Sequence, residues 1–357
     1  MRIVQITDYL AYGDAISNHM IALMKGLKRH DITCQIYARN ISPLQKNNAE
    51  YYNSYREEKD DIILYHFSTG TDLNHEVLNH KCKVILNYHN ITPPQFFKGY
   101  SRLNFESCKK GYEDAQGFIG KIDSVISDSK YNSLQLKKMG FTCPMYNAPI
   151  LVDFEQYGQA TGVGERKINS AEPVRILFVG RIAPNKCQEK IIRDFYYYNK
   201  LHNSNSQLIL AGNYQGCEAY YLRLKKYVHM LGLKNVIFTG HIPFIKLLEY
   251  YRTSTIFLCE SEHEGFCVPL VEAMYFKIPT IAYDSSAIKE TLGDAGLIFE
   301  KHDPELVCSL IEKILGDQEL RMKLETNQVE RLNEFNHEKV LSEYMKILGV
   351  NCIDEEK

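Results

Sequence analysis

Short apolar runs alternate with amphipathic stretches along both halves of the chain. In the first half, these runs predict strands at Arg2–Thr7, Cys34–Arg39, Asp61–Phe67, Lys83–His89 and Ser124–Ser127. The clearest amphipathic stretch between them, Asp14–Lys28, predicts a helix. In the second half, the runs predict strands at Val174–Gly180, Gln207–Gly212, Val236–Gly240, Thr255–Glu260, Pro279–Tyr283 and Gly296–Glu300. Continuous apolar strands interleaved with helices are typical of parallel sheets covered on both faces, so we expect an α/β fold.

A glycine-rich, weakly apolar stretch breaks this rhythm near the middle of the chain. It spans Gly158–Glu165, and Ser170–Pro173 follows before the next strand. We interpret it as a linker between two Rossmann-like, doubly wound domains, residues 1–165 and residues 166–335. We expect the last helix, within residues 336–357, to rejoin the first domain. Such sheets bind ligands at the carboxyl ends of their strands, so two of them can face a central cleft.

Composition and charge narrow the possible partners and the compartment. The formal net charge of -2 gives no overall attraction to nucleic acid or to an anionic membrane. The ten cysteines are scattered without a Cys-x-x-Cys pair, and no signal-peptide pattern precedes Ile3. No apolar stretch approaches the roughly 18 to 20 residues that a membrane span needs. We therefore expect reduced thiols and a cytoplasmic protein.

The sharpest local motif runs from Glu264 to Glu272, after one predicted strand and into a predicted helix at Val268–Lys277. Gly265 lets a ligand approach the backbone closely, and Pro269 suits a first helical turn. The amides of that turn, at the positive end of the helix dipole, can bind phosphate. An ordinary acidic loop before an amphipathic helix remains the alternative.

A second motif, Gly180-Arg181-Ile182-Ala183-Pro184-Asn185-Lys186, also follows a predicted strand. Arg181 offers a planar fork that matches phosphate oxygens, and Lys186 adds a point charge. Cations fixed near a departing diphosphate stabilise the transition state more than the ground state. Two solvated surface cations beside a turn are the alternative interpretation.

Together the two motifs resemble glycosyltransferase family four, whose arrangement of two domains is known as GT-B. The family's Glu-x7-Glu pattern is matched by Glu264 and Glu272, and its Gly-Arg…Lys element by Gly180, Arg181 and Lys186. The resemblance implies that Arg181 and Lys186 hold the donor diphosphate, that Glu272 takes the ribose hydroxyls, and that Glu264 contacts the transferred sugar. It also implies that the amides of Gly265, Phe266, Cys267 and Val268 lie near the donor. It extends most clearly over residues 174–315.

In the first half, the resemblance points to two loops that follow predicted strands. His89 ends the strand at Lys83–His89, where a near-neutral side chain can contact reacting hydroxyls, so it is the candidate catalytic histidine of the acceptor side. A hydrogen-bonded structural histidine is the alternative. The family has two adjacent glycines after its first strand. Here only Gly13 remains, as a candidate donor contact. Asp14 and Asn18 are candidate residues of the acceptor side, and Asp14 is also a plausible helix N-cap.

No Asp-x-Asp pair occurs in the chain, so we expect the cations Arg181 and Lys186 to take the place of a divalent metal. We expect no metal and no cofactor, with a nucleotide sugar as the co-substrate. The resemblance further implies retention of anomeric configuration, and transfer of a hexose from a UDP- or GDP-linked donor to a glycan or lipid-linked acceptor, as in bacterial surface polysaccharide synthesis.

Two alternative functions remain open. A nucleotide-sugar epimerase can use the same fold, and an inactive partner subunit can as well. Neither half contains the Gly-x-Gly-x-x-Gly motif that a nicotinamide dehydrogenase would need.

Between Lys98 and Lys138 basic residues slightly outnumber acidic ones, and several aromatic residues lie among them. This composition is compatible with peripheral contact at the inner face of the membrane or with a solvated helix face.

Overall fold

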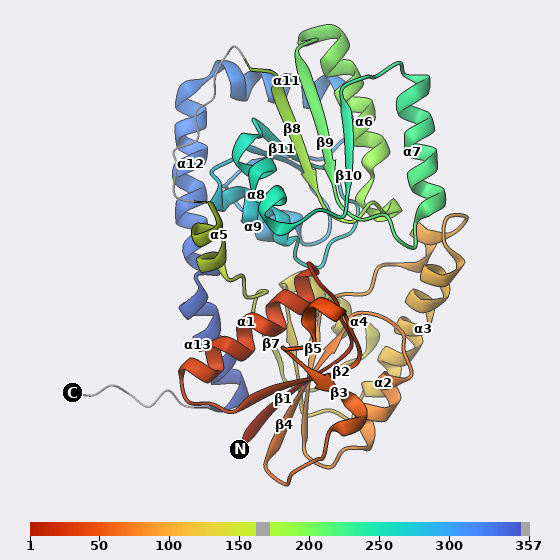
Figure 1. The fold of residues 1–357 in the computed structure, drawn as a ribbon, viewed down its shortest axis with the longest axis vertical. Helices are drawn as coiled ribbons and strands as arrows, with labels where there is room; N and C mark the ends of the chain where they lie inside the picture. The colour runs from red at the N-terminus through yellow and green to blue at the C-terminus, as the bar shows by residue number, and fades with distance from the viewer. Residues whose placement is uncertain (162–171, 351–357) are drawn as a thin grey trace, which may run out of the picture. The chain divides into compact units, whose positions relative to one another are not determined.

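The computed structural model describes residues 1–161 and 172–350, and two parallel sheets dominate it (Figure 1). The first four residues of the predicted linker, 158–161, instead end the helix α5, Phe154–Thr161, so that part of the prediction is wrong. Residues 162–165 and the boundary between residues 165 and 166 lie outside the described residues. The first sheet has the strand order β3-β2-β1-β4-β5-β6-β7, and the second has the order β10-β9-β8-β11-β12-β13. All pairings between neighbouring strands are parallel, as the continuous apolar runs indicate.

The strands of the first sheet are β1 Arg2–Leu10, β2 Cys34–Ile41, β3 Glu50–Tyr51, β4 Asp61–Phe67, β5 Lys83–Tyr88, β6 Ser124–Ser127 and β7 Met145–Asn147. Those of the second sheet are β8 Val174–Val179, β9 Ser206–Ala211, β10 Val236–Gly240, β11 Ile256–Cys259, β12 Thr280–Tyr283 and β13 Leu297–Phe299. Every strand that the apolar runs predict is present, with ends that agree to within a few residues. Two short edge strands, β3 and β7, were not predicted.

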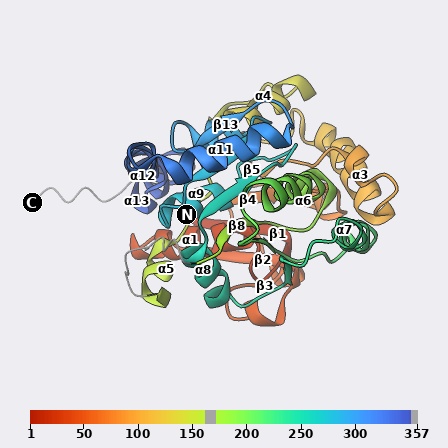
Figure 2. The same ribbon diagram turned by 90° about the horizontal axis from the view of Figure 1, so that it is seen from above.

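The helices that join or follow these strands are α1 Ala15–Arg29, α2 Leu73–Glu76, α3 Arg102–Phe118, α4 Lys130–Met139, α5 Phe154–Thr161, α6 Gln188–Tyr197, α7 Glu218–Met230, α8 Phe244–Thr253, α9 Val268–Tyr275, α10 Ile288–Leu292, α11 Pro304–Gly316, α12 Gln318–Leu332 and α13 His337–Leu348. Within the second sheet's layers, α6 and α7 lie side by side (Figures 1 and 2). None of the helices in the described ranges combines the length and apolarity that a membrane crossing requires.

The chain forms two compact units, and each is built from segments that are not contiguous in the sequence. The first unit contains Met1–Pro93, Glu106–Phe154 and the described residues from Phe335 onward, and the second contains Pro94–Phe105 and Glu155–Glu334. Helix α13 belongs to the first unit because its apolar face packs on α1 (Figure 1). The segment Pro94–Phe105 belongs to the second unit, where the Asn104 amide donates to the Gly216 carbonyl oxygen at 3.0 Å.

Local sequence explains how the best-predicted helix starts and how closely it packs. Asp14 is the N-cap of α1, and its carboxylate accepts from the Ser17 N–H at 2.9 Å. The buried face of α1 includes Leu23 and Leu27, which share a core with Leu341 and Tyr344 of α13. The predicted helix at Asp14–Lys28 and its cap are therefore confirmed.

Candidate functional site

Two loops of the second unit meet where its strand order reverses. Residues 180–186 follow β8, and residues 260–267 follow β11. These two strands are neighbours in the sheet although two strands, β9 and β10, and three α-helices, α6 to α8, lie between them in the sequence. From β8 the chain continues outward to β9, and from β11 it continues outward to β12 in the other direction. The carboxyl edge at such a switch point is where open α/β sheets bind ligands. Both motifs singled out in the sequence lie at this edge.

The loop after β8 begins at Gly180, which lies very close to Gly212 at the end of β9. Gly180 has φ 153°, and a Cβ atom built on Gly212 would lie 1.9 Å from the Gly180 carbonyl oxygen. No side chain larger than hydrogen fits at residue 212, so β8 and the end of β9 can come together there. The Gly180 N–H donates to the Ala211 carbonyl oxygen at 2.9 Å, which keeps the loop's start in line with the sheet.

Arg181 and Lys186 leave this loop in different environments. Arg181 is exposed, and its guanidinium carbon lies 5.7 Å from the centre of the Phe97 ring, a cation–π contact within the same unit. Lys186 ends a short 3₁₀ turn, Pro184–Lys186, and its side chain is 20% exposed. The loop thus presents one solvent-facing cation and one half-enclosed cation.

Lys186 is paired with Glu264 of the β11 loop. The Lys186 Nζ lies 2.5 Å from Glu264 Oε2, and the Glu264 side chain is 10% exposed. Burial opposes the charge on the ammonium, but the Glu264 carboxylate outweighs it, so the pKa of Lys186 is raised above its usual value. The side chain is therefore a fixed cation at neutral pH, and it joins the two motifs directly.

Helix α9 begins beside this pair. Its N-cap, Cys267, has φ 77°, and Pro269 lies in its first turn, as the sequence indicated. N–H groups of a first helical turn have no partner within the helix, and the helix dipole adds positive potential there. The start of a helix can therefore bind an anion, and the contacts of Gly265 to Val268 with the donor stay a prediction.

Hydrogen bonds hold the β11 loop in one conformation. The Glu264 N–H donates to Ser286 Oγ at 2.8 Å, and the Ser285 hydroxyl donates to the Ser261 carbonyl oxygen at 2.5 Å. Asn185 anchors the loop from the other side, because its Nδ2 donates to the His263 carbonyl oxygen at 3.1 Å. The Lys186–Glu264 pair therefore lies between loops that are held by hydrogen bonds. Electrostatic stabilisation of a leaving group requires such preorganised charges.

Glu272 is buried and is hydrogen-bonded within the second unit. Its Oε1 accepts from the Tyr157 hydroxyl and its Oε2 from the Tyr251 hydroxyl, both at 2.6 Å. Burial raises the pKa of Glu272, and the two tyrosine hydrogen bonds act against that rise. One tyrosine hydroxyl contacts each carboxylate oxygen, and contact of Glu272 with a ribose diol stays a prediction.

The predicted residues of the first unit lie in loops at the carboxyl edge of its own sheet. Gly13 is exposed with φ 74°, a left-handed conformation that favours glycine, and Asn18 is exposed one turn into α1. The carboxylate of Asp14 also accepts from the Ser17 hydroxyl at 2.9 Å, so its capping role is fully formed. The structure shows what Asp14 does for α1, and the substrate contacts of Gly13, Asp14 and Asn18 stay predictions.

His89 is enclosed, with a side chain only 1% exposed. Its Nδ1 lies 2.9 Å from an Asp128 carboxylate oxygen, and its Nε2 lies 2.8 Å from His66 Nδ1. The other nitrogen of His66 lies 3.0 Å from Gln5 Oε1. Both nitrogens of His89 therefore have protein partners, and a contact with a reacting hydroxyl stays a prediction that requires one of them to change partner.

The direction of this chain of hydrogen bonds fixes where its protons are. Gln5 Nε2 donates to the Met20 carbonyl oxygen at 2.9 Å, so Gln5 Oε1 accepts from His66 Nε2. Burial lowers the pKa of His66 well below its usual value, so its ring is neutral and its Nδ1 accepts from His89 Nε2. On the other side of His89, burial raises the pKa of Asp128, and contact with His89 acts against that rise.

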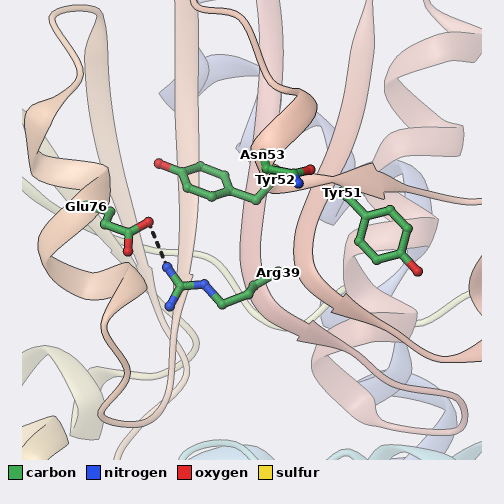
Figure 3. Close-up of a pocket in the computed structure, with 5 residues that line it drawn as sticks. All are labelled: Arg39, Tyr51, Tyr52, Asn53 and Glu76. Atoms are coloured by element: carbon green, nitrogen blue, oxygen red, sulfur yellow. Dashed lines mark ion pairs between the residues drawn. The ribbon is translucent and has the colours of Figure 1, made fainter.

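A separate hollow of about 210 Å³ lies in the first unit (Figure 3). It is lined by Arg39, Tyr51, Tyr52, Asn53 and Glu76, and Arg39 forms an ion pair of 2.7 Å with Glu76. None of these residues belongs to the motifs singled out in the sequence.

The two sheets and the loops of the second unit define a class of protein. It has two Rossmann-like domains, and one of them presents cations and the start of a helix that suit a diphosphate group. Residues 165–331 match the family model described as glycosyl transferases group 1. The chain therefore carries a glycosyltransferase group 1 domain, and that domain contains the loops after β8 and β11.

Two curated relatives extend this similarity. The amylovoran biosynthesis glycosyltransferase AmsD of Erwinia amylovora is 23% identical over 176 residues, which cover 49% of this chain and 48% of AmsD. The match thus spans about half the length of that relative. The uncharacterized glycosyltransferase MJ1178 of Methanocaldococcus jannaschii is 25% identical over 377 residues, covering 100% of this chain and 98% of MJ1178.

The fold is also that of solved glycosyltransferase structures. Anabaena Alr3699/HepE in complex with UDP and glucose superposes with a TM-score of 0.75 at 16% identity, over 98% of this chain and 99% of HepE. The predicted GT-B fold is confirmed by this likeness and by the two parallel sheets. The similarity at this level of identity concerns the fold alone, and membership of glycosyltransferase family four stays a prediction.

Proposed function

We propose that the chain is a retaining, metal-independent glycosyltransferase that moves a hexose from a UDP- or GDP-linked donor to a glycan or lipid-linked acceptor. The observation that carries the proposal is the Lys186–Glu264 pair at the start of α9, at the switch point of the second sheet. This ion pair brings together Lys186, the proposed diphosphate-binding cation, and Glu264, the proposed sugar-facing carboxylate. A glycosyltransferase group 1 domain over residues 165–331 supports it.

In the proposed reaction, the second unit binds the leaving diphosphate. Lys186 donates to its oxygens, and the first-turn amides of α9 donate from the other side. Arg181 reaches the same group from its exposed position after β8. Negative charge grows on the diphosphate as the glycosidic bond breaks, so these donors stabilise the transition state more than the bound donor.

Glu264 would leave Lys186 partly free for the diphosphate and turn toward the hydroxyls of the transferred sugar. Departure and attack on the same face of the sugar give retention. With two side-chain cations and a helix start at the diphosphate, the charge that a divalent metal would neutralise already has partners.

The acceptor class follows from the relatives. AmsD is named for amylovoran biosynthesis, and other relatives are named as O-antigen chain and capsular polysaccharide glycosyltransferases. By this analogy the acceptor is a growing bacterial surface glycan or its lipid-linked precursor, reached from the cytoplasmic face of the membrane.

The proposal is tested by incubating the purified protein with a panel of UDP- and GDP-sugars, with and without lipid-linked or oligosaccharide acceptors. We expect one donor to be consumed with release of nucleoside diphosphate and formation of a glycosylated acceptor, unchanged by EDTA. Lys186→Ala and Glu264→Ala should each lower kcat by about 10² to 10³, the loss typical of removing a group that stabilises transition-state charge. Lys246→Ala, an exposed lysine paired with Glu249 on α8, is the matched control and should keep normal turnover.

Three results would count against the proposal. Normal turnover in both Lys186→Ala and Glu264→Ala would contradict the site. A rearranged nucleotide sugar formed without acceptor would indicate an epimerase. Loss of activity with EDTA that manganese restores would contradict metal independence.

A further inference from the structure

Three side chains of metal-ligand type converge beneath the donor loop of the second unit. Cys259 ends β11, Glu264 lies in the loop that follows, and Cys267 is the N-cap of α9. The two Sγ atoms and a carboxylate oxygen of Glu264 all lie within 4.8 Å of one another, and all three residues are buried.

The backbone explains why residues eight positions apart meet. The chain leaves β11 at Cys259, is tied by Ser285 and Ser286 at its outer turn, and returns through the left-handed conformation of Cys267. That return brings the Cys267 thiol back to the strand end where Cys259 lies. The cluster is therefore a product of the same loop geometry that presents Glu264 and the start of α9.

The donor set has a clear chemical preference. Two sulfur ligands and one carboxylate oxygen suit thiophilic divalent cations such as Zn²⁺ and Cd²⁺, whereas Mg²⁺ and Mn²⁺ prefer oxygen ligands throughout. Three protein ligands leave a fourth tetrahedral position for water.

Charge also favours such an ion. A divalent cation with two thiolates and the Glu264 carboxylate carries one net negative charge, and the Lys186 ammonium at 2.5 Å from Glu264 Oε2 cancels it. A buried cluster without net charge avoids most of the cost of placing an ion in a low-dielectric interior. Cys267 and Glu264 are 7% and 8% exposed, so the cluster is not completely closed to solvent.

We propose that Cys259, Glu264 and Cys267 form a binding site for a thiophilic divalent cation, and that occupation of this site inhibits sugar transfer by engaging Glu264. The binding part stands on the cluster alone, and the inhibitory part rests on the proposed function of Glu264. The cation site shares Glu264 with the proposed catalytic arrangement, and sugar transfer in the proposed mechanism needs no metal.

Binding exchanges protons for metal and needs no oxidant. Two S–H bonds break, two metal–sulfur bonds form, and two protons pass to solvent. Because binding releases two protons, affinity for the cation should rise with pH.

Titration with Cd²⁺ tests the binding part, because thiolate-to-cadmium charge transfer gives an ultraviolet absorption band that does not depend on activity. We expect a band that saturates at one Cd²⁺ per chain, persists in excess Mg²⁺, and is lost in both Cys259→Ala and Cys267→Ala. Cys308→Ala is the matched control, since Cys308 is equally buried but lies on α11, where its thiol donates to the Asp194 carbonyl oxygen. That variant should keep the band.

The inhibitory part is tested by measuring transfer with and without Zn²⁺ for each variant. We expect Zn²⁺ to lower wild-type turnover at least tenfold, reversibly on chelation and competitively with the nucleotide sugar, while the residual turnover of Cys259→Ala is insensitive to Zn²⁺. Absence of the Cd²⁺ band, or its retention in both variants, would overturn the site. A normal band with Zn²⁺-insensitive transfer would overturn the link to Glu264. A chain that shows the band but transfers no sugar would leave the site standing and refute the proposed function instead.

Discussion

Asp194 and Glu260 bring two carboxyl groups together inside the second unit. Both residues are fully buried, and Asp194 Oδ2 and Glu260 Oε1 are buried atoms for which the described residues provide no donor. Burial, followed by the neighbouring Glu260 charge, raises the pKa of Asp194 to about 8, and burial raises that of Glu260 to about 7. A single proton shared between the two carboxyls satisfies both atoms, so the pair titrates as a unit.

This shared proton makes the second unit sensitive to alkaline pH. A carboxyl whose pKa is raised in the folded state binds a proton that the unfolded chain releases, so its stabilising effect is lost as pH rises toward 8. We expect the free energy of unfolding to fall by a few kcal/mol, on the order of the shift in pKa, between pH 6 and pH 8.5. Urea unfolding at the two pH values measures it.

Asp194→Asn isolates the effect, because an amide can donate to Glu260 without a titrating proton. Its unfolding free energy should change much less between the two pH values. Asp294→Asn, an exposed aspartate in the same unit, should keep the wild-type dependence. An equal slope in the wild type and in Asp194→Asn would refute the shared proton.

At the scale of elements, α3 contains two glycines, one in a tightly packed position and one with open space beside it. A Cβ atom on Gly111 would lie 2.9 Å from the Gly70 nitrogen and 3.2 Å from the Thr69 carbonyl carbon, which are backbone atoms that cannot move aside easily. A Cβ atom on Gly117 would meet nothing within 4 Å. Gly111 therefore lets the turn after β4 dock on the helix, whereas Gly117 only weakens the helix.

Alanine at these two positions should shift stability in opposite directions. Gly117→Ala should raise the free energy of unfolding by up to about 1 kcal/mol through helix propensity. Gly111→Ala should lower it by about 1 to 3 kcal/mol, because overpacking outweighs the same gain. Chemical denaturation of the two variants is the measurement, and a stabilised Gly111→Ala would contradict the close approach.

The elements also show what the sequence could predict. Most of the strands found from apolar runs have consecutive buried residues, and β4 is buried at every position. Burial on both faces is what makes an apolar run continuous. The missed strands β3, Glu50–Tyr51, and β7, Met145–Asn147, are short and mostly exposed edges, so no apolar run marks them. The two loops of the site were found because each directly follows a predicted strand.

The partners of the site residues could not be found in this way. Phe97 beside Arg181, and Tyr157 and Tyr251 on Glu272, come from distant parts of the chain. Nothing in their local sequence marks them, since their positions depend on how helices pack on the sheet. For the same reason the sequence placed His89 at a strand end but gave no sign of its contacts with His66 and Asp128.

At the scale of the whole molecule, the first unit takes its final helix from the far end of the described chain. Leu341 of α13 is 1% exposed, and its methyl groups face Gly26 of α1. Leu341→Ala should lower the free energy of unfolding of the first unit by about 2 to 5 kcal/mol, the usual cost of a cavity in a core. Thermal unfolding should show the loss.

Leu134→Ala, an exposed leucine on α4 of the same unit, is the control and should change stability by less than about 0.5 kcal/mol. The donor site lies in the second unit, so a nucleoside diphosphate that stabilises the wild type should still stabilise Leu341→Ala. Loss of that stabilisation would show that the two units do not keep separate cores.

The return of α13 to the first unit also sets an order for folding during synthesis. The ribosome releases residues 155–334, nearly all of the second unit, before it releases the helix that completes the first. Until then α1 has an uncovered apolar face where Leu341 and Tyr344 will pack. The unit that is translated first is thus the last to close its core, and its nascent form presents a surface that chaperones recognise.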